Sequence, residues 1–295
     1  MSRGRDEIIL NVFAYIMIGV IAAGCVIPFL MVLMGSLQSE DSVLRNGFSL
    51  IPEQLDFTAY RYVFDSPAAI LRAYGVSIFI TGAGTLISLY FSSMAAYVLA
   101  RKDVKYRNAL AFYLFFTTLF NGGLVPYYLM IKNYLKIDNS FTILLLSGMF
   151  NVIYILIIRT YIAGSVPDSI SESAKIDGAN DFKIFMSIVL PLLKPVLAAI
   201  GLFIALGYWN DWYTSLLFVT NDKIIPLQYL LYKILTFARF SQQILSQNAA
   251  VAVIDLPGET LKLALTIVAT GPIIFLYPFV QKHFVAGLTI GAVKG

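Results

Sequence analysis

The chain has 295 residues, of which 59% are hydrophobic and only 13% are charged. Soluble domains carry about 25% charged residues, and a mean hydropathy of +0.78 agrees with the low charge. This composition excludes a water-soluble globule and indicates an integral membrane protein. The net charge of +4 is too small to indicate a nucleic-acid partner. With one cysteine, Cys25, and one histidine, His283, the chain offers neither an internal disulfide nor a His/Cys metal site.

Long stretches without charged residues predict the membrane-spanning helices. A bilayer is crossed by about 20 predominantly apolar residues in a helix, and six stretches of the chain meet or approach this length. We therefore predict an all-α integral membrane protein, a single transmembrane domain over residues 1–295 with six spanning helices. The predicted spans are residues 11–37, 74–100, 109–131, 141–163, 195–219 and 261–281.

Lysine and arginine residues near the ends of the spans set the expected orientation, because cytoplasmic loops carry more of them. The short connection after the second span holds four such residues, Arg101, Lys102, Lys105 and Arg107. We expect both termini to lie in the cytoplasm. The long connection over residues 220–260 then lies outside, and its stretch 227–240 has apolar residues at helical spacing. That stretch is either a helix on the membrane surface or a docking surface for an extracytoplasmic partner.

The cytoplasmic connection over residues 164–194 has the pattern of a folded unit. Ser169 and Glu172 have the spacing of a capping box, which predicts a short helix beginning there. Gly178 is suited to end that helix, because glycine readily adopts the left-handed conformation. A second helix is predicted from Asn180 or the next residue, with an apolar stripe formed by Phe182, Phe185, Ile188 and Val189. Such a helix pair either docks a cytoplasmic partner or lies on the membrane surface.

This connection resembles the EAA signature of ABC importer permeases, whose pattern is Glu-Ala-Ala, three residues, Gly, nine residues and Ile-x-Leu-Pro. Ser173 stands where the family usually has alanine, a small-for-small change. The Asp-Gly-Ala within the pattern is similar to the version found in sugar-importer permeases. The resemblance implies that the residues coupling the chain to an ATPase are Glu172, Ser173, Ala174, Asp177, Gly178, Ala179, Ile188, Leu190 and Pro191.

The resemblance extends over most of the chain. The C-terminal ending is similar to the tail of maltose-type permeases, which implies that Gly291, Lys294 and Gly295 contact the ATPase subunits. The sequence from Trp209 to Trp212 resembles the branch of permeases that imports complex oligosaccharides, including uronate-containing saccharides.

The resemblance implies a type I ABC importer permease fold and one subunit of an ATP-driven, binding-protein-dependent importer of sugars, with oligosaccharides from polysaccharide breakdown as the expected cargo. Such a permease forms half of a translocation path with a second, homologous permease chain. Two partner ATPase subunits bind ATP and Mg²⁺, and an extracytoplasmic binding protein delivers the sugar. The expected location is the bacterial cytoplasmic membrane. The chain itself is expected to hold no cofactor, metal or catalytic site, and it contains no P-loop motif.

Polar residues inside the predicted spans are candidates for the sugar path, because such groups are costly in lipid and usually face the interior. The candidates are Trp209, Asn210, Asp211, Asn121 and Asn151. Asparagine also bridges packed helices, and tryptophan also lines membrane interfaces, so both interpretations stay open. The alternative function is a secondary, ion-coupled carrier, which normally shows an internal repeat and broken helices. A membrane enzyme fits less well, since one histidine and one cysteine make no catalytic constellation.

Overall fold

The computed structural model describes residues 5–52, 54–247 and 258–274 of the chain. Every regular element in this described part is a helix, which confirms the predicted all-α class. Internal contacts divide the chain into two units, Met1–Pro67 with Leu231–Gly271 and Ala68–Leu230 with Pro272–Gly295. The elements in chain order are α1 (Arg5–Gly35), α2 (Glu40–Asn46), α3 (Thr58–Val63), α4 (Pro67–Ala100), α5 (Arg107–Leu119), α6 (Leu124–Leu129), η1 (Met130–Leu135), α7 (Phe141–Leu146), α8 (Val152–Ser165), α9 (Asp168–Ile176), α10 (Asp181–Ile184), η2 (Phe185–Val189), α11 (Leu190–Leu192), α12 (Lys194–Asn210), α13 (Tyr213–Phe218), η3 (Asp222–Ile224), α14 (Leu227–Gln247) and a last helix over residues 259–274.

Two helices of the described part are long and apolar enough to cross a membrane alone. They are Ile9–Gly35 within α1 and the whole of α4. The number rises to five if each of three sharply bent helix pairs is counted as one span, so the expected total of six stays a prediction. The sixth predicted span, residues 261–281, is described only as far as residue 274. The predicted ATPase-contacting tail, Gly291, Lys294 and Gly295, lies outside the described residues.

The structure corrects the prediction of one continuous helix over residues 109–131. α5 ends at Leu119, and the helix that starts at Leu124 is bent away from it by 110°. Between them Gly123 has a φ of +88°, a left-handed conformation that glycine adopts without steric cost. The Asn121 side chain accepts a hydrogen bond from the N–H of Gly123 at 2.8 Å, which holds the turn. Hydropathy does not detect this break, because no charged residue marks it.

Two further predicted helices are also broken, those over residues 141–163 and 195–219. The first divides into α7 and α8, and Asn151 begins α8 by accepting a hydrogen bond from the N–H of Ile153 at 3.0 Å. The second divides into α12 and α13, and Asp211 accepts from the N–H of Thr214 at 3.0 Å. Each break frees backbone groups that lipid cannot hydrate, so a polar side chain beside the break satisfies one of them.

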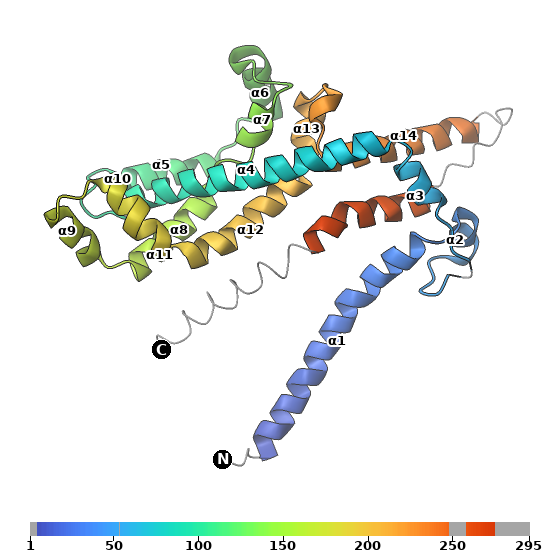
Figure 1. Ribbon diagram of the computed structural model, residues 1–295, viewed down its shortest axis with the longest axis horizontal. Coiled ribbons are helices and arrows are strands. Elements are labelled where there is room, and N and C mark those ends of the chain that lie inside the picture. Colours follow the sequence, from blue (N-terminus) through green and yellow to red (C-terminus); the bar gives the residue numbers. More distant parts are fainter. Residues whose placement is uncertain (1–4, 53, 248–257, 275–295) are drawn as a thin grey trace. The chain divides into compact units, whose positions relative to one another are not determined.

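α4 and α12 run side by side in the second unit (Figure 1), and one tyrosine joins them to the break between α7 and α8. Tyr208 of α12 donates a hydrogen bond from its hydroxyl to the carbonyl of Leu145 at 2.5 Å. Its ring lies between two glycines, since a Cβ atom on Gly84 or Gly148 would come within 2.6 Å or 2.9 Å of the ring. The two glycines therefore leave the space that the ring fills.

In the first unit, the carboxylate of Glu40 holds the start of the last helix. It accepts hydrogen bonds from the N–H groups of Glu259 and Thr260 at 2.7 and 2.9 Å, and from the Thr260 hydroxyl at 2.7 Å. The first N–H groups of a helix have no partner within that helix. Glu40 thus caps a helix from a distant part of the sequence.

The predicted amphipathic helix over residues 227–240 is confirmed as part of α14. Leu231 and Ala238 of its apolar stripe are buried, whereas Phe237 lies off the stripe and is exposed. Docking of an extracytoplasmic partner to this helix stays a prediction.

Candidate functional site

The coupling segment, residues 164–194, is built around a tightly closed helix end. The N–H of Gly178 donates to the carbonyl of Lys175 at 3.0 Å. The N–H of Ala179 donates to the carbonyl of Ala174 at 2.9 Å, and the two bonds together form a Schellman motif at the end of α9. Gly178 has a φ of +82°, where any other residue would be strained. The prediction that Gly178 ends this helix in the left-handed conformation is confirmed.

The predicted capping box of Ser169 and Glu172 is wrong. α9 begins one residue earlier, at Asp168, and its N-cap is Pro167, which makes no side-chain capping bond. Proline has a fixed φ and favours an extended residue before it, so the chain turns at this point before a capping serine is reached. α9 consequently leaves the direction of α8 by 78°.

The residues of the EAA signature divide into those that build the coupling segment and those that face solvent. Ala174 is buried at the end of α9, and Ile188 and Leu190 are partly buried against the hydrophobic core. These residues, with the Schellman glycine, determine the shape of the segment. The signature residues that are exposed to solvent in addition to Gly178 are Glu172, Ser173, Asp177 and Pro191.

The second helix of the coupling segment begins after Asn180, as predicted. The Asn180 side chain accepts a hydrogen bond from the N–H three residues on, at 2.8 Å, and so caps α10. The predicted apolar stripe is correct in part, since Phe185 and Val189 are buried but Phe182 is 57% exposed. Ile184 is buried in its place. The helix continues as the π-helical η2, whose wider turn departs from the spacing assumed for an α-helix.

The C-terminal end of α4 packs against the coupling segment. The ring of Tyr97 lies 5.5 Å from the ring of Phe185 in η2, measured between centroids, and both residues are buried. The guanidinium of Arg101 lies 5.6 Å from the centroid of the Tyr97 ring, within range of a cation–π contact. Aromatic packing therefore joins α4 to the second helix of the segment.

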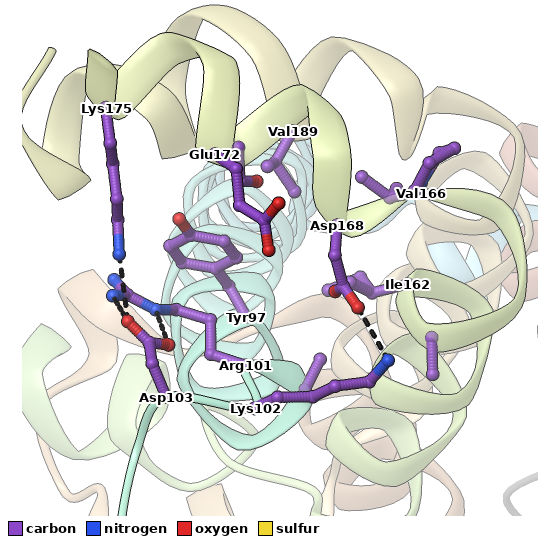
Figure 2. Close-up of a pocket in the computed structure, with 14 residues that line it drawn as sticks. Tyr97, Arg101, Lys102, Asp103, Ile162, Val166, Asp168, Glu172, Lys175 and Val189 are labelled. Carbon is purple, nitrogen blue, oxygen red and sulfur yellow. Dashed lines mark hydrogen bonds and ion pairs between the residues drawn. The ribbon is translucent and has the colours of Figure 1, made fainter.

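A charged turn follows α4, and it consists of Arg101, Lys102 and Asp103. The Nζ atom of Lys102 lies 2.6 Å from a carboxylate oxygen of Asp168, and that of Lys175 lies 2.9 Å from Asp103 (Figure 2). The Nη1 atom of Arg101 lies 2.6 Å from a carboxylate oxygen of Asp181, and Arg101 also pairs with Asp103. The charged turn thus contacts both helices of the coupling segment.

The partners in this network stabilise one another's charged forms. Hydrogen bonds from Arg101 and Lys175 hold the pKa of Asp103 well below its usual range. The hydrogen bond to Asp103 in turn raises the pKa of Arg101 and the pKa of Lys175. These three groups are charged at neutral pH, so the contacts of Asp103 with Arg101 and Lys175 are ion pairs.

A groove of about 220 Å³ lies between the charged turn and α9. Glu172 lines this groove together with Arg101, Lys102 and Lys175 (Figure 2). Within the described part of the chain, Glu172 forms no hydrogen bond or ion pair. Its carboxylate is therefore open to a basic group of another molecule.

Two features of this site are not among the predictions from the sequence. The first is the charged turn, although Asp103 within a basic loop, and acids at the starts of two predicted helices, are signals of ion pairing. Ile176, which is not part of the signature, is 86% exposed on α9, more than any other large apolar side chain in the described residues. An exposed isoleucine beside the exposed signature residues extends the surface available to a partner.

The predicted sugar-path residues lie at the three helix breaks. Trp209 and Asn210 end α12, where Trp209 is buried and Asn210 is exposed and accepts a hydrogen bond from Gln228 at 3.3 Å. Asp211 follows, and its second carboxylate oxygen lies 3.4 Å from the hydroxyl of Ser147 at another break. Two breaks that are distant in sequence therefore meet at this acid. The remaining candidates, which turn or cap the chain at their own breaks, are Asn121 and Asn151.

Comparison with known proteins gives a family match over most of the chain. Residues 89–290 match the family described as "Binding-protein-dependent transport system inner membrane component". The polygalacturonan/rhamnogalacturonan transport system permease protein YtcP of Bacillus subtilis (strain 168) is 39% identical over 271 residues, which cover 92% of this chain and 93% of that relative. Protein LplC of the same strain is 38% identical over 297 residues, which cover 100% of this chain and 98% of LplC.

A solved structure shows the same likeness in three dimensions. It is the crystal structure of a bacterial ABC transporter involved in the import of the acidic polysaccharide alginate. One of its chains matches with a TM-score of 0.77 and 29% sequence identity, over 96% of this chain and 99% of that one. The likeness therefore extends far beyond the coupling segment.

Proposed function

This chain belongs to the family of binding-protein-dependent transport system inner membrane components, and from this membership we propose how it works in an importer. It is a permease of an ABC importer for sugars or oligosaccharides. Broken helices are also a feature of secondary carriers, but the relatives support the ATP-driven importer over the ion-coupled alternative. The relatives are transport permeases rather than enzymes.

The chain forms half of a translocation path and couples to an ATPase through the coupling segment. The observation that carries this proposal is the helix α9, whose C-terminal end is closed by the Schellman motif. Its Ala174 is buried, whereas Glu172, Ser173 and Ile176 are exposed to solvent. The Schellman motif gives hydrogen-bond partners to the last carbonyl groups of α9, which stabilises this end of the helix. The unpaired carboxylate of Glu172 suits a basic group on the ATPase.

The cargo we propose is an oligosaccharide released from a polysaccharide, with uronate-containing saccharides as the favoured class. The support comes from one relative and one solved structure. The relative is named as a polygalacturonan/rhamnogalacturonan permease, and the solved transporter is involved in the import of the acidic polysaccharide alginate. The helix breaks around Asp211, with Trp209 and Asn210 beside it, are our candidates for the sugar path. Asn121 and Asn151 are secondary candidates at the other breaks.

The proposed assembly has a second, homologous permease chain, two ATPase subunits that bind ATP and Mg²⁺, and an extracytoplasmic binding protein. The C-terminal tail contacts the ATPase subunits. The chain lies in the bacterial cytoplasmic membrane with six spans and both termini in the cytoplasm. The basic residues beside the second span support this orientation.

The experiment that tests the assembly is affinity purification of the tagged chain from its native membranes in mild detergent, followed by mass spectrometry. We expect a second permease, an ATPase and a binding protein to be recovered together. The purified complex is then placed in lipid vesicles with oligogalacturonides, and uptake is measured with and without ATP. Recovery of a stable, solitary chain, or uptake driven by an ion gradient without ATP, would contradict the proposal.

The contact with the ATPase is tested by Glu172→Lys, which reverses the charge at the exposed face of α9. We expect import to fall by about tenfold or more, because loss of an interfacial charge pair costs at least about 2 kcal/mol. Membrane insertion should be unchanged, since the side chain is exposed. Asp65→Lys, an equally drastic change at an exposed acid of the first unit, is the matched control. Normal import by Glu172→Lys would contradict the docking role.

A further inference from the structure

The coupling segment contacts α4 although the two are not consecutive in the chain. Along the chain the segment continues into α8 on one side and α12 on the other, and helix axes bend by 78° and 81° at these junctions. A displacement of α9 reaches α8 and α12 through those bends. Its routes to α4 are non-covalent: the ring contact of Tyr97 with Phe185 reaches the second helix of the segment, and the charged turn is the contact that reaches α9 itself.

The charged turn holds α9 at both ends. Lys102 pairs with Asp168, the first residue of α9, at 2.6 Å, and Asp103 pairs with Lys175 in the last turn at 2.9 Å. Because the two contacts lie at opposite ends of the helix, α9 cannot tilt about one of them without stretching the other. A single contact would leave that rotation free.

Arg101 holds the second helix of the segment at the same time. Its guanidinium pairs with Asp181, the first residue of α10, and with Asp103, which also receives Lys175. The Arg101 side chain is only 17% exposed and lies over the Tyr97 ring, so packing as well as charge sets its orientation. A guanidinium presents its donors in one rigid plane, a geometry that a lysine does not reproduce.

We infer that the charged turn is a rigid positioning link, which makes the coupling segment and the end of α4 move as one body. A movement imposed on α9 is thereby delivered directly to α4 as well as through α8 and α12. The inference rests on the proposed function, since it concerns how movement of an ATPase reaches the spans. Arg101, Lys102 and Asp103 are positioning residues that act through other groups.

α4 is suited to carry such a movement into the membrane. It is a continuous helix of 34 residues, whereas the helices over the predicted third, fourth and fifth spans are broken. From its end at Ala100 to Gly84 the distance along the helix is about 24 Å at 1.5 Å per residue. Gly84 contacts Tyr208, whose hydroxyl binds the carbonyl of Leu145 beside the proposed sugar path. α4 therefore connects the coupling segment to that region without a break.

The test uses the complete importer in lipid vesicles, with ATP hydrolysis and oligogalacturonide import measured on the same preparation. Arg101→Gln and Asp181→Asn each remove a charge from the link. We expect both to assemble and hydrolyse ATP while import per ATP falls roughly fivefold or more, the lower end of typical coupling between sites. Lys105→Gln, in the same loop but outside the network, is the matched control and should import normally.

The outcomes separate this inference from the proposed function. If the unmodified complex shows no ATP-dependent import, the proposed function fails whatever the variants do. If it imports and Arg101→Gln keeps the same import per ATP, the positioning link is wrong while the proposed function stands. If import and ATP hydrolysis fall in the same proportion, the variant has lost active complex and not the coupling between the two activities. That result would also overturn the link.

A charge exchange at an exposed pair avoids unfolding. Lys102 and Asp168 are 74% and 54% exposed at their side chains, so reversing either charge leaves the core intact. Lys102→Glu and Asp168→Lys should each lower import per ATP, and the double variant should recover it. A double variant no better than Asp168→Lys alone would overturn the link.

A covalent bridge tests whether the link is rigid through the transport cycle. In a Cys25→Ser background, Lys102→Cys with Asp168→Cys removes the ion pair, and a short bifunctional thiol reagent then joins the two positions. We expect import per ATP to fall in the unbridged pair and to rise again on bridging, with no effect of the reagent on either single cysteine. Import that stays low or is blocked after bridging would show that the contact opens during the cycle, and it would overturn the inference.

Discussion

At the scale of single residues, Tyr208 satisfies a backbone group that the break after α7 leaves free. Leu145 lies in the last turn of α7, where helix carbonyls lack a partner within the helix. An unsatisfied carbonyl in lipid costs several kcal/mol, so the hydroxyl of Tyr208 is held at this carbonyl. A Cβ atom at either flanking position would overlap the ring where it now lies, and both positions are glycine.

Gly84→Ala is therefore expected to destabilise the protein by about 1–3 kcal/mol, the usual cost of overpacking. The new Cβ would lie 2.6 Å from the ring of Tyr208. Gly82→Ala, two residues away in α4, is the matched control, because its Cβ meets no atom within 4 Å. That change should be neutral or stabilising by up to about 1 kcal/mol. The measurement is unfolding in detergent, and equal stability of the two variants would contradict the packing argument.

At the scale of whole elements, the helix ends of this chain depend on distant side chains. The last helix begins at residue 259, and Glu40 of α2 supplies the acceptor for its first N–H groups. Burial acts to raise the pKa of Glu40, but hydrogen bonds from Glu259 and Thr260 outweigh it, and the pKa lies below its ordinary value. The charged carboxylate is thus the form that the folded state prefers.

The lowered pKa of Glu40 predicts a pH-dependent contribution to stability. Because the folded-state pKa is below the unfolded value of about 4.3, this contribution is present above pH 4.3 and is lost as the pH falls through the folded-state pKa. Glu40→Gln should destabilise by about 1 kcal/mol at pH 7. The difference from the unmodified protein should disappear at acidic pH in denaturant titrations.

The control for this prediction is Asp41→Asn. Asp41 is the exposed neighbour of Glu40 in the first turn of α2, so it reports any effect on α2 itself. A Glu40→Gln defect that persists unchanged at low pH, or that Asp41→Asn reproduces, would argue against the cap.

At the scale of the whole molecule, the proposed orientation in the membrane assigns each candidate site to one side. In that orientation the coupling segment faces the cytoplasm, where it would meet an ATPase, and the end of η1 faces outward. The apolar window of α1 has no buried residue in the structure, so its side chains are free to face lipid or another chain.

Thiol labelling measures this orientation. In a Cys25→Ser background, Tyr134→Cys should react with a membrane-impermeant reagent added to intact cells, since Tyr134 is 82% exposed and expected outside. Ser173→Cys should react only in inverted vesicles. In the unmodified protein, Cys25 should react in neither preparation, because it lies within the apolar helix α1. Labelling of Ser173→Cys from outside would reverse the proposed orientation.

The sequence by itself determined the membrane class, the helical fold, the end of α9 and the start of α10. Low charge and long apolar stretches can be read directly from the chain. The glycine that ends α9 and the asparagine that caps α10 act on the backbone within a few positions of themselves. Each can be predicted because its physical effect extends over only a few positions. The capping box is the exception among these local signals, since Pro167 turns the chain ahead of Ser169.

Only the tertiary structure decided the helix breaks, the charged turn and the cap of the last helix. Lys175 and Asp103 are 72 positions apart, and Glu40 and Thr260 are 220 apart. Nothing in the local sequence indicates which distant group a charge will meet. At the helix breaks, local side chains such as Asn151 cap some of the freed backbone groups, but the carbonyl of Leu145 takes its partner, Tyr208, from a distant helix. These features arise from packing between elements, and hydropathy along a chain does not contain that information.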